Sequence, residues 1–191
     1  APGVSSIRLF EAIATEVLAQ IRMFNAQDLA NTSWAFATAG ITSIRLFEAI
    51  AAEAQVQIRK FKSQHLANTS WAFATAGISS AWLFEAVLAR ISDVFNEFQP
   101  VDLSQLYQVH LFLTFEAPEL GLASLLSGFE ADLKAAFTAA EPSPSRTQRD
   151  VAAALERVGW RHEFEYVTAE GLSLDMAQLE SKLAVEFDGP S

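Results

Sequence analysis

Three carboxylates near the C-terminal end of the chain have the type and spacing to do chemistry. Asp175 falls in one predicted strand, and Glu186 and Asp188 lie two residues apart at the end of the next one. Carboxylates on neighbouring strands can hold a hard divalent cation, because such ions prefer oxygen ligands. Mg²⁺ is therefore the cofactor to expect if this part of the chain is catalytic, and otherwise we expect none.

The other common signatures of catalysis are missing from the sequence. His65, His110 and His162 are not spaced as metal ligands, and we expect His162 to hold a solvated position at the start of a strand. There is no Gly-rich phosphate loop, no nucleophile elbow and no HExxH motif. The chain also has no cysteine, which excludes disulfides and cysteine-based zinc sites and fits a reducing compartment.

A 37-residue repeat supplies the elements that could position these groups. The word NTSWAFATAGI occurs unchanged at Asn31–Ile41 and Asn68–Ile78, and the alignment extends over repeats at about 5–41 and 42–78. A degraded third copy covers about 79–115. Such periodicity predicts a mainly α-helical solenoid. Because GVSS at residues 3–6 matches GITS at 40–43, we expect the chain to begin at the tail of a preceding unit.

Each repeat is predicted to be a pair of helices. Apolar residues recur at three- and four-residue steps through the first helix of each copy, as in an amphipathic helix. In the first repeat we expect a second helix from Leu29 to about Ala39, with Asp28 as its N-cap and Gly40 as its stop. Trp34 and Trp71 are interpreted as core residues, with stacking on nucleic-acid bases as the alternative.

Charge is unevenly distributed along the chain. The net charge is −10, which argues against non-specific nucleic-acid binding by the whole surface. The acidity lies outside the first two repeats, whose basic residues cluster near the junctions between helices: Arg22, Arg59, Lys60 and Lys62. No apolar run approaches the roughly 20 residues that span a bilayer, so we expect no membrane insertion.

The segments QDLANTSWAFATAGI and QHLANTSWAFATAGI resemble the signature of the octotricopeptide and heptatricopeptide helical repeats of organellar RNA-binding proteins. The tail GWRHEFEYVTAEGLSLDMAQLESKLAVEFDGPS is similar to the first half of a RAP domain. We therefore predict a helical-repeat region over 1–141 and the N-terminal part of a RAP domain over 142–191. From the residues alone, the tail predicts a linker at Pro142–Ser145, a helix over Arg146–Val158 and three strands, a small α/β unit.

This resemblance implies sequence-selective RNA binding in organellar RNA processing, stability or translation. The partners would be single-stranded or ribosomal RNA and organellar ribosomal proteins, in a mitochondrion or plastid. We predict that one polar face per repeat reads a base and that the four basic residues contact phosphates. The predicted base-reading residues are Asp28, Asn31, His65, Asn68, Asp102 and Gln105.

Two alternatives remain open at the level of sequence. Helical repeats also serve as protein-interaction scaffolds, and a net charge of −10 suits that role. The RAP fold resembles the restriction-endonuclease-like fold, so Asp175, Glu186 and Asp188 would match the metal-binding positions of a nuclease. In such enzymes the position of Asp188 carries a lysine, and this difference favours a non-catalytic role for the tail.

Overall fold

The computed structural model describes residues 4–139 and 144–187, and divides the chain into two compact units, Ala1–Phe137 and Thr138–Ser191. The fold is mainly helical, with a small three-stranded sheet in the second unit. Asp188 and the first residues of the predicted linker lie outside the described residues. Among the described helices, none combines the length and the apolar character that a membrane span requires.

Three helix pairs form most of the first unit, and each pair corresponds to one sequence repeat. A short 3-10 turn (η1 to η3) joins the two helices of each pair. The helices are α1 (Val4–Gln20), α2 (Ala26–Thr38), α3 (Ile44–Gln57), α4 (Ser63–Thr75), α5 (Ala81–Val94) and α6 (Pro100–Phe115). The turns are η1 (Ile21–Met23), η2 (Ile58–Lys60) and η3 (Phe95–Glu97).

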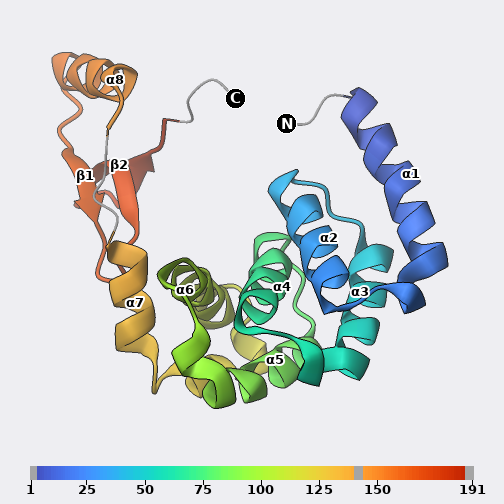
Figure 1. The fold of residues 1–191 in the computed structure, drawn as a ribbon. Helices are drawn as coiled ribbons and strands as arrows, with labels where there is room; N and C mark the ends of the chain where they lie inside the picture. Colours follow the sequence, from blue (N-terminus) through green and yellow to red (C-terminus); the bar gives the residue numbers. More distant parts are fainter. Residues whose placement is uncertain (1–3, 140–143, 188–191) are drawn as a thin grey trace. The chain divides into compact units, whose positions relative to one another are not determined.

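The helices of this unit lie in two layers, with α2, α4 and α6 side by side and α1, α3 and α5 along their outer side (Figure 1). Neighbouring helices of the α2, α4 and α6 layer pack more closely than those of the other layer. Small side chains explain this difference, because Ala67 and Ala72 of α4 are fully buried and let the backbones approach. The prediction that each repeat contains two helices is confirmed.

Aromatic pairs fill the space between the two layers. Phe10 of α1 meets Phe36 of α2 edge to face at 4.9 Å between ring centroids, and Phe47 meets Phe73 in the same way at 5.0 Å. Edge-to-face geometry is a favoured arrangement of aromatic rings, and it adds to the burial of their large apolar area. The identical words of the two repeats thus make the same contact twice.

Glycines end the second helices as the sequence predicts. Gly40 and Gly77 adopt φ values of +66° and +67°, in the left-handed region that favours glycine. After each of them the chain turns back, so that Ile41 N–H donates to the Phe36 carbonyl oxygen at 3.0 Å and Ile78 repeats the contact. This is the Schellman arrangement, which satisfies carbonyls at the helix end.

The start of the second helix differs from the sequence prediction. Helix α2 begins at Ala26, and its N-cap is Asn25, whose side chain accepts hydrogen bonds from the backbone N–H groups of Gln27 and Asp28. Asp28 instead lies three residues into the helix and accepts the Asn25 N–H at 3.0 Å. The prediction of Asp28 as N-cap was wrong because a capping box uses both residues and places the first one further upstream.

A non-repeat segment covers the far side of the third helix pair. It contains the 3-10 helices η4 (Pro118–Leu120) and η5 (Ala123–Leu126) and the helix α7 (Glu130–Thr138). Phe129 stacks on Phe95 at 4.1 Å, and Leu126 and Leu133 are fully buried. The α5 and α6 end of the stack is therefore closed by residues that do not belong to the repeat.

The second unit contains one helix and one sheet. Helix α8 (Arg146–Arg157) begins with the predicted capping box of Ser145 and Gln148. Strands β1 (Glu163–Val167), β2 (Ser173–Gln178) and β3 (Leu183–Val185) form an antiparallel sheet in the order β1-β2-β3. The helix and strands were predicted from sequence, whereas a RAP or restriction-endonuclease-like fold for this unit stays a prediction.

Candidate functional site

The three turns that join first to second helices lie next to one another along one edge of the stack. Gln57, at the end of α3, donates from Nε2 to the carbonyl oxygen of Phe24 in the first turn at 2.8 Å. Ser63, at the start of α4, donates from Oγ to the carbonyl oxygen of Glu97 in the third turn at 3.1 Å. These bonds tie the turns of successive repeats together, so groups carried by the turns are held in fixed order.

Basic side chains gather on this edge in the first two repeats, and we call them the basic edge. Its members are Arg22 in η1, Arg59 and Lys60 in η2, and Lys62 just before α4. All four are exposed, and in the described part of the chain none of them forms an ion pair. Helices α2 and α4 also begin here, and the N-terminus of a helix carries partial positive charge. The edge is thus suited to attract anions.

Opposite charge appears where the edge reaches the third repeat. A hollow of about 440 Å³ beside Arg59 is also lined by Arg90 and Asp93. Those two side chains form an ion pair of 2.6 Å, so the charge of Arg90 is already matched. The third turn itself carries Glu97 and no basic residue. The basic edge is therefore confined to two repeats, as the charge distribution of the sequence predicts.

A row of mostly polar side chains runs along α2 and α4. Its spacing of four, three and four residues places its members on one face of each helix. In α2 the row consists of Gln27, Asn31, Trp34 and Thr38, and in α4 of Gln64, Asn68, Trp71 and Thr75. The α2 members are all exposed, and those of α4 are exposed or half-buried. We call these eight residues the polar stripe.

The structure gives the predicted base-reading residues two different positions. Asn31 and Asn68 lie on the polar stripe, Asn31 exposed and Asn68 half-buried. Gln105 follows in α6, half-buried, with its Oε1 atom buried and without a hydrogen-bond partner. These three positions, spaced by 37 residues, continue one row across three helices.

The other three predicted readers serve at the starts of their helices. Asp28 accepts the Asn25 N–H, and Asp102 accepts the Gln99 N–H at 2.9 Å. His65 holds the same place in α4, where its Nδ1 accepts the Lys62 N–H at 3.4 Å. Asp102 is only 3% exposed, so the prediction that it lies on an open face was wrong. The sequence grouped these residues with the asparagines because both sets recur every 37 residues. The asparagines recur unchanged, whereas the residue three positions earlier varies between Asp and His.

The two tryptophans differ from their predicted role in the core. Trp34 is 42% exposed, and Trp71 is half-buried. The Trp71 Nε1 group donates to Oε1 of Gln108 at 2.9 Å, which joins α4 to α6. The core interpretation of Trp34 was wrong because the stripe faces outward. The spacing of Asn31, Trp34 and Thr38 was the signal in the sequence that could have placed it there.

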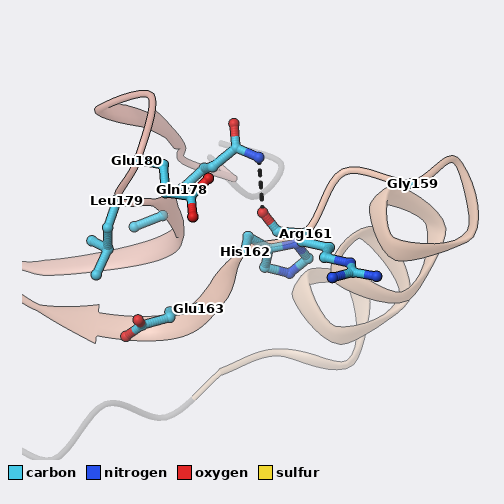
Figure 2. A pocket seen from close by; sticks show the side chains of 8 residues that line it. Gly159, Arg161, His162, Glu163, Gln178, Leu179 and Glu180 are labelled. Carbon is cyan, nitrogen blue, oxygen red and sulfur yellow. Dashed lines mark hydrogen bonds between the residues drawn. The ribbon is translucent and has the colours of Figure 1, made fainter.

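A shallow hollow of about 410 Å³ lies in the second unit, between the end of α8 and the end of β2. Figure 2 shows Arg161 and His162 on one side and Gln178 and Glu180 on the other, with Gln178 donating to the Arg161 carbonyl oxygen at 3.1 Å. His162 Nδ1 lies 3.1 Å from the Trp160 carbonyl oxygen. Because a carbonyl oxygen only accepts, Nδ1 carries the proton, and Nε2 of the neutral ring is left as an acceptor.

Asp175, one of the candidate carboxylates of this unit, accepts two hydrogen bonds. Asp175 accepts the Nε2 group of Gln148 on one oxygen at 2.9 Å and the Phe187 N–H on the other at 2.7 Å. Both oxygens therefore fasten the sheet to α8 and to the residues after β3. Glu186 is exposed, and within residues 4–139 and 144–187 no three His, Asp or Glu side chains come together as metal ligands. Asp188, the third candidate ligand, lies outside the described residues, so the Mg²⁺ site stays a prediction, and we derive no chemistry through one.

A scan against protein-family models finds no match to this chain, and a search of the curated proteins finds none either. The resemblance to octotricopeptide and heptatricopeptide repeats and to a RAP domain therefore stays a prediction.

Proposed function

We propose that the first unit is part of an α-solenoid that binds single-stranded RNA across the basic edge and the polar stripe. The observation that carries the proposal is the alignment of the turns. Hydrogen bonds from Gln57 and Ser63 hold the turns of three repeats side by side, and four exposed basic residues lie on the first two. A row of phosphates needs such a row of cations, and the acidic remainder of the chain would repel phosphate elsewhere.

The polar stripe would meet the bases of the bound strand. Asn31 and Asn68 carry both donors and acceptors, so each can bond the edge of an unpaired base. Trp34 exposes enough of its indole to stack on a base, and stacking tolerates any base sequence. Recognition would thus combine phosphate contacts at the start of each second helix with base contacts along its length. In the setting that the family resemblance implies, the RNA would belong to a mitochondrion or plastid, with the second unit adding a contact.

The salt dependence of binding tests this proposal. Each phosphate contact to a single strand contributes about −0.7 to the slope of log affinity against log salt, so four contacts predict a slope of about −2.8. We expect fluorescence anisotropy with a short labelled single-stranded RNA to give that slope. Replacing Arg22, Arg59, Lys60 and Lys62 by alanine should bring the slope close to zero. For a comparison at equal charge, a double variant of Arg59 and Lys60 should bring the slope to about −1.4. Its matched control replaces Arg8 and Arg45, which are exposed on α1 and α3, away from the turns.

The control variant should retain the slope of the unsubstituted protein. Equal loss in both double variants would mean that net charge alone drives binding, and the proposed site would be wrong. Absence of salt-sensitive binding by the unsubstituted protein would refute RNA binding through this edge altogether.

A protein-interaction scaffold is the second candidate, and the third helix pair favours it. Val101 and Phe115 of α6 are 64% and 61% exposed, and Glu97 and Glu116 are exposed near the two ends of that helix. Exposed apolar side chains with acidic residues near them in the sequence suit a basic protein partner better than RNA. Binding of a partner protein that is lost on Phe115→Ser, but kept when the basic edge is neutralised, would support this function over the first.

A further inference from the structure

Two identical stretches of sequence in the first two repeats differ in burial. Residues 7–14 and 44–51 have the same sequence, yet Leu9 is 59% exposed whereas Leu46 is fully buried. Ile13 is 38% exposed, and its counterpart Ile50 is fully buried. Because the local sequence is the same, the difference comes from the neighbours of each helix. Helix α3 has α1 against it, and no described residue covers the corresponding side of α1.

The second helices show the same difference. Ala35 of α2 is exposed while Ala72 of α4 is fully buried, and Thr32 is half-buried while Thr69 is fully buried. In α4 these positions are covered by α2, its close neighbour. The uncovered residues therefore form one surface across α1 and α2. We call it the end face, and it consists of Leu9, Ile13, Thr32 and Ala35.

The packing between the first two repeats shows which partner fits the end face. The equivalent surface of α3 and α4 is covered by α1 and α2, a helix pair of the same repeat. The end face carries the same residues at the same helix positions as that covered surface. Its shape is therefore expected to be the same. The end face also lacks the polar outer surface that a terminal repeat needs for solubility, since Leu9 and Ile13 point out of it.

The opposite end of the stack supports the same reasoning. There the far side of α5 and α6 is closed by the non-repeat segment from Pro118 to Thr138, through contacts such as Phe95 with Phe129. That surface is occupied, so a second copy of this chain has no free repeat surface to place on the end face. The end face needs a unit whose repeat surface is open.

We propose that the end face binds a further two-helix unit of the same 37-residue sequence type, joined in the same polypeptide ahead of Ser5. The unit would place its second helix against Thr32 and Ala35 and its first helix against Leu9 and Ile13. The polar stripe and the basic edge would then extend into that unit, although the proposal does not depend on RNA binding.

The test adds such a unit to the full chain. A copy of Thr42–Ile78 is fused directly ahead of Ser5, and backbone hydrogen exchange is measured in α1 with and without it. We expect exchange in α1 to slow by roughly tenfold or more, because its open side becomes covered. A fused unit of scrambled sequence serves as the control for chain length and should leave the exchange in α1 unchanged.

A double variant, Leu9→Gln with Ile13→Gln, shows whether the end face is responsible. In the unextended chain it should change exchange in α1 by less than about twofold, because Leu9 and Ile13 are 59% and 38% exposed. In the fused chain it should abolish the protection. Unchanged exchange on fusion, or protection that survives the double variant, would overturn the proposal. So would self-association of the unextended chain in sedimentation that the double variant removes, because a second copy would then be the occupant.

Discussion

Replacing His65 by aspartate should stabilise the first unit, because it restores a contact that both neighbouring repeats make better. The third residue of α2 and of α6 is Asp28 and Asp102, whose carboxylates accept the preceding N-cap N–H at 3.0 and 2.9 Å. In α4 the imidazole of His65 makes this contact at 3.4 Å, beyond the usual length of such a bond. Lys62 at the N-cap offers no acceptor to complete the capping box.

The size of the effect follows from two contributions. A well-formed hydrogen bond to the N-cap N–H is worth about 0.5–1.5 kcal/mol, of which the long His65 contact supplies only part. A carboxylate in the first turn adds about 0.3–1 kcal/mol through the helix dipole. We therefore expect the free energy of unfolding at pH 7 to rise by about 1 kcal/mol, and the thermal midpoint by about 2–4 °C.

The variant should also change how stability depends on pH. Burial, and then the positive charge of Lys62, lower the pKa of His65 below its ordinary value of 6.5. The unfolded chain therefore binds the proton more readily than the folded one, and stability falls as pH drops below about 6.5. His65→Asp removes this loss, since an aspartate stays ionised in that range.

Urea unfolding followed by circular dichroism between pH 5 and pH 8 measures both effects. His65→Ala, which removes the titrating group without supplying an acceptor, is the matched control. It should flatten the pH dependence without the gain at pH 7. A destabilised aspartate variant, or one with the original loss of stability between pH 7 and pH 5, would refute this account of the α4 start.

Two further predictions concern side chains that form hydrogen bonds in the structure but were given other roles from the sequence. Trp71→Phe should lower the free energy of unfolding in urea by about 0.5–1.5 kcal/mol, because the hydrogen bond to Gln108 is lost. Trp34→Phe, in the identical sequence, should lower it by less than about 0.5 kcal/mol. Equal losses would show that the bond contributes nothing. Asp175→Ala should destabilise the second unit by about 1–3 kcal/mol and speed hydrogen exchange in β2, because two donors lose their acceptor. Unchanged exchange would show that the carboxylate does not fasten the sheet.

The elements whose signals are local could be predicted from the sequence. Gly40 stops α2, and Ser145 with Gln148 starts α8, because each of these residues satisfies backbone groups a few positions away. The helix pairs followed from apolar steps of three and four residues. Such signals depend only on residues nearby in the sequence, and these can be read directly from it.

The positions that were predicted wrongly depend on neighbours in space. Trp34 and Trp71 stand in the same eleven-residue word, yet one is largely exposed and the other bonds to α6. Asp102 looked like a base reader because its position varies between repeats, and it is buried in a capping contact. Neither fact can be read from the spacing, because burial is decided by the helix that packs alongside.

The two copies of the repeat also help to separate packing from function. Some exposed positions differ between them: Met23 in the first copy corresponds to Lys60 in the second, and Ala19 corresponds to Val56. Solvent exposure alone therefore does not keep a position the same in both copies. On the second helices, however, Gln27, Asn31, Trp34 and Thr38 all recur without change.

Packing accounts for part of this identity in α4, where Trp71 is half-buried and bonds to Gln108, but less so in α2, where all four side chains are exposed. A glutamine, an asparagine and a threonine on a solvated helix face also add nothing to helix propensity that alanine would not exceed. The proposed RNA contact would give a physical reason for their recurrence at the exposed positions of α2. A ligand that crosses both helices and meets the same groups twice, as a single strand of repeating phosphates and bases would, places the same requirement on all four positions.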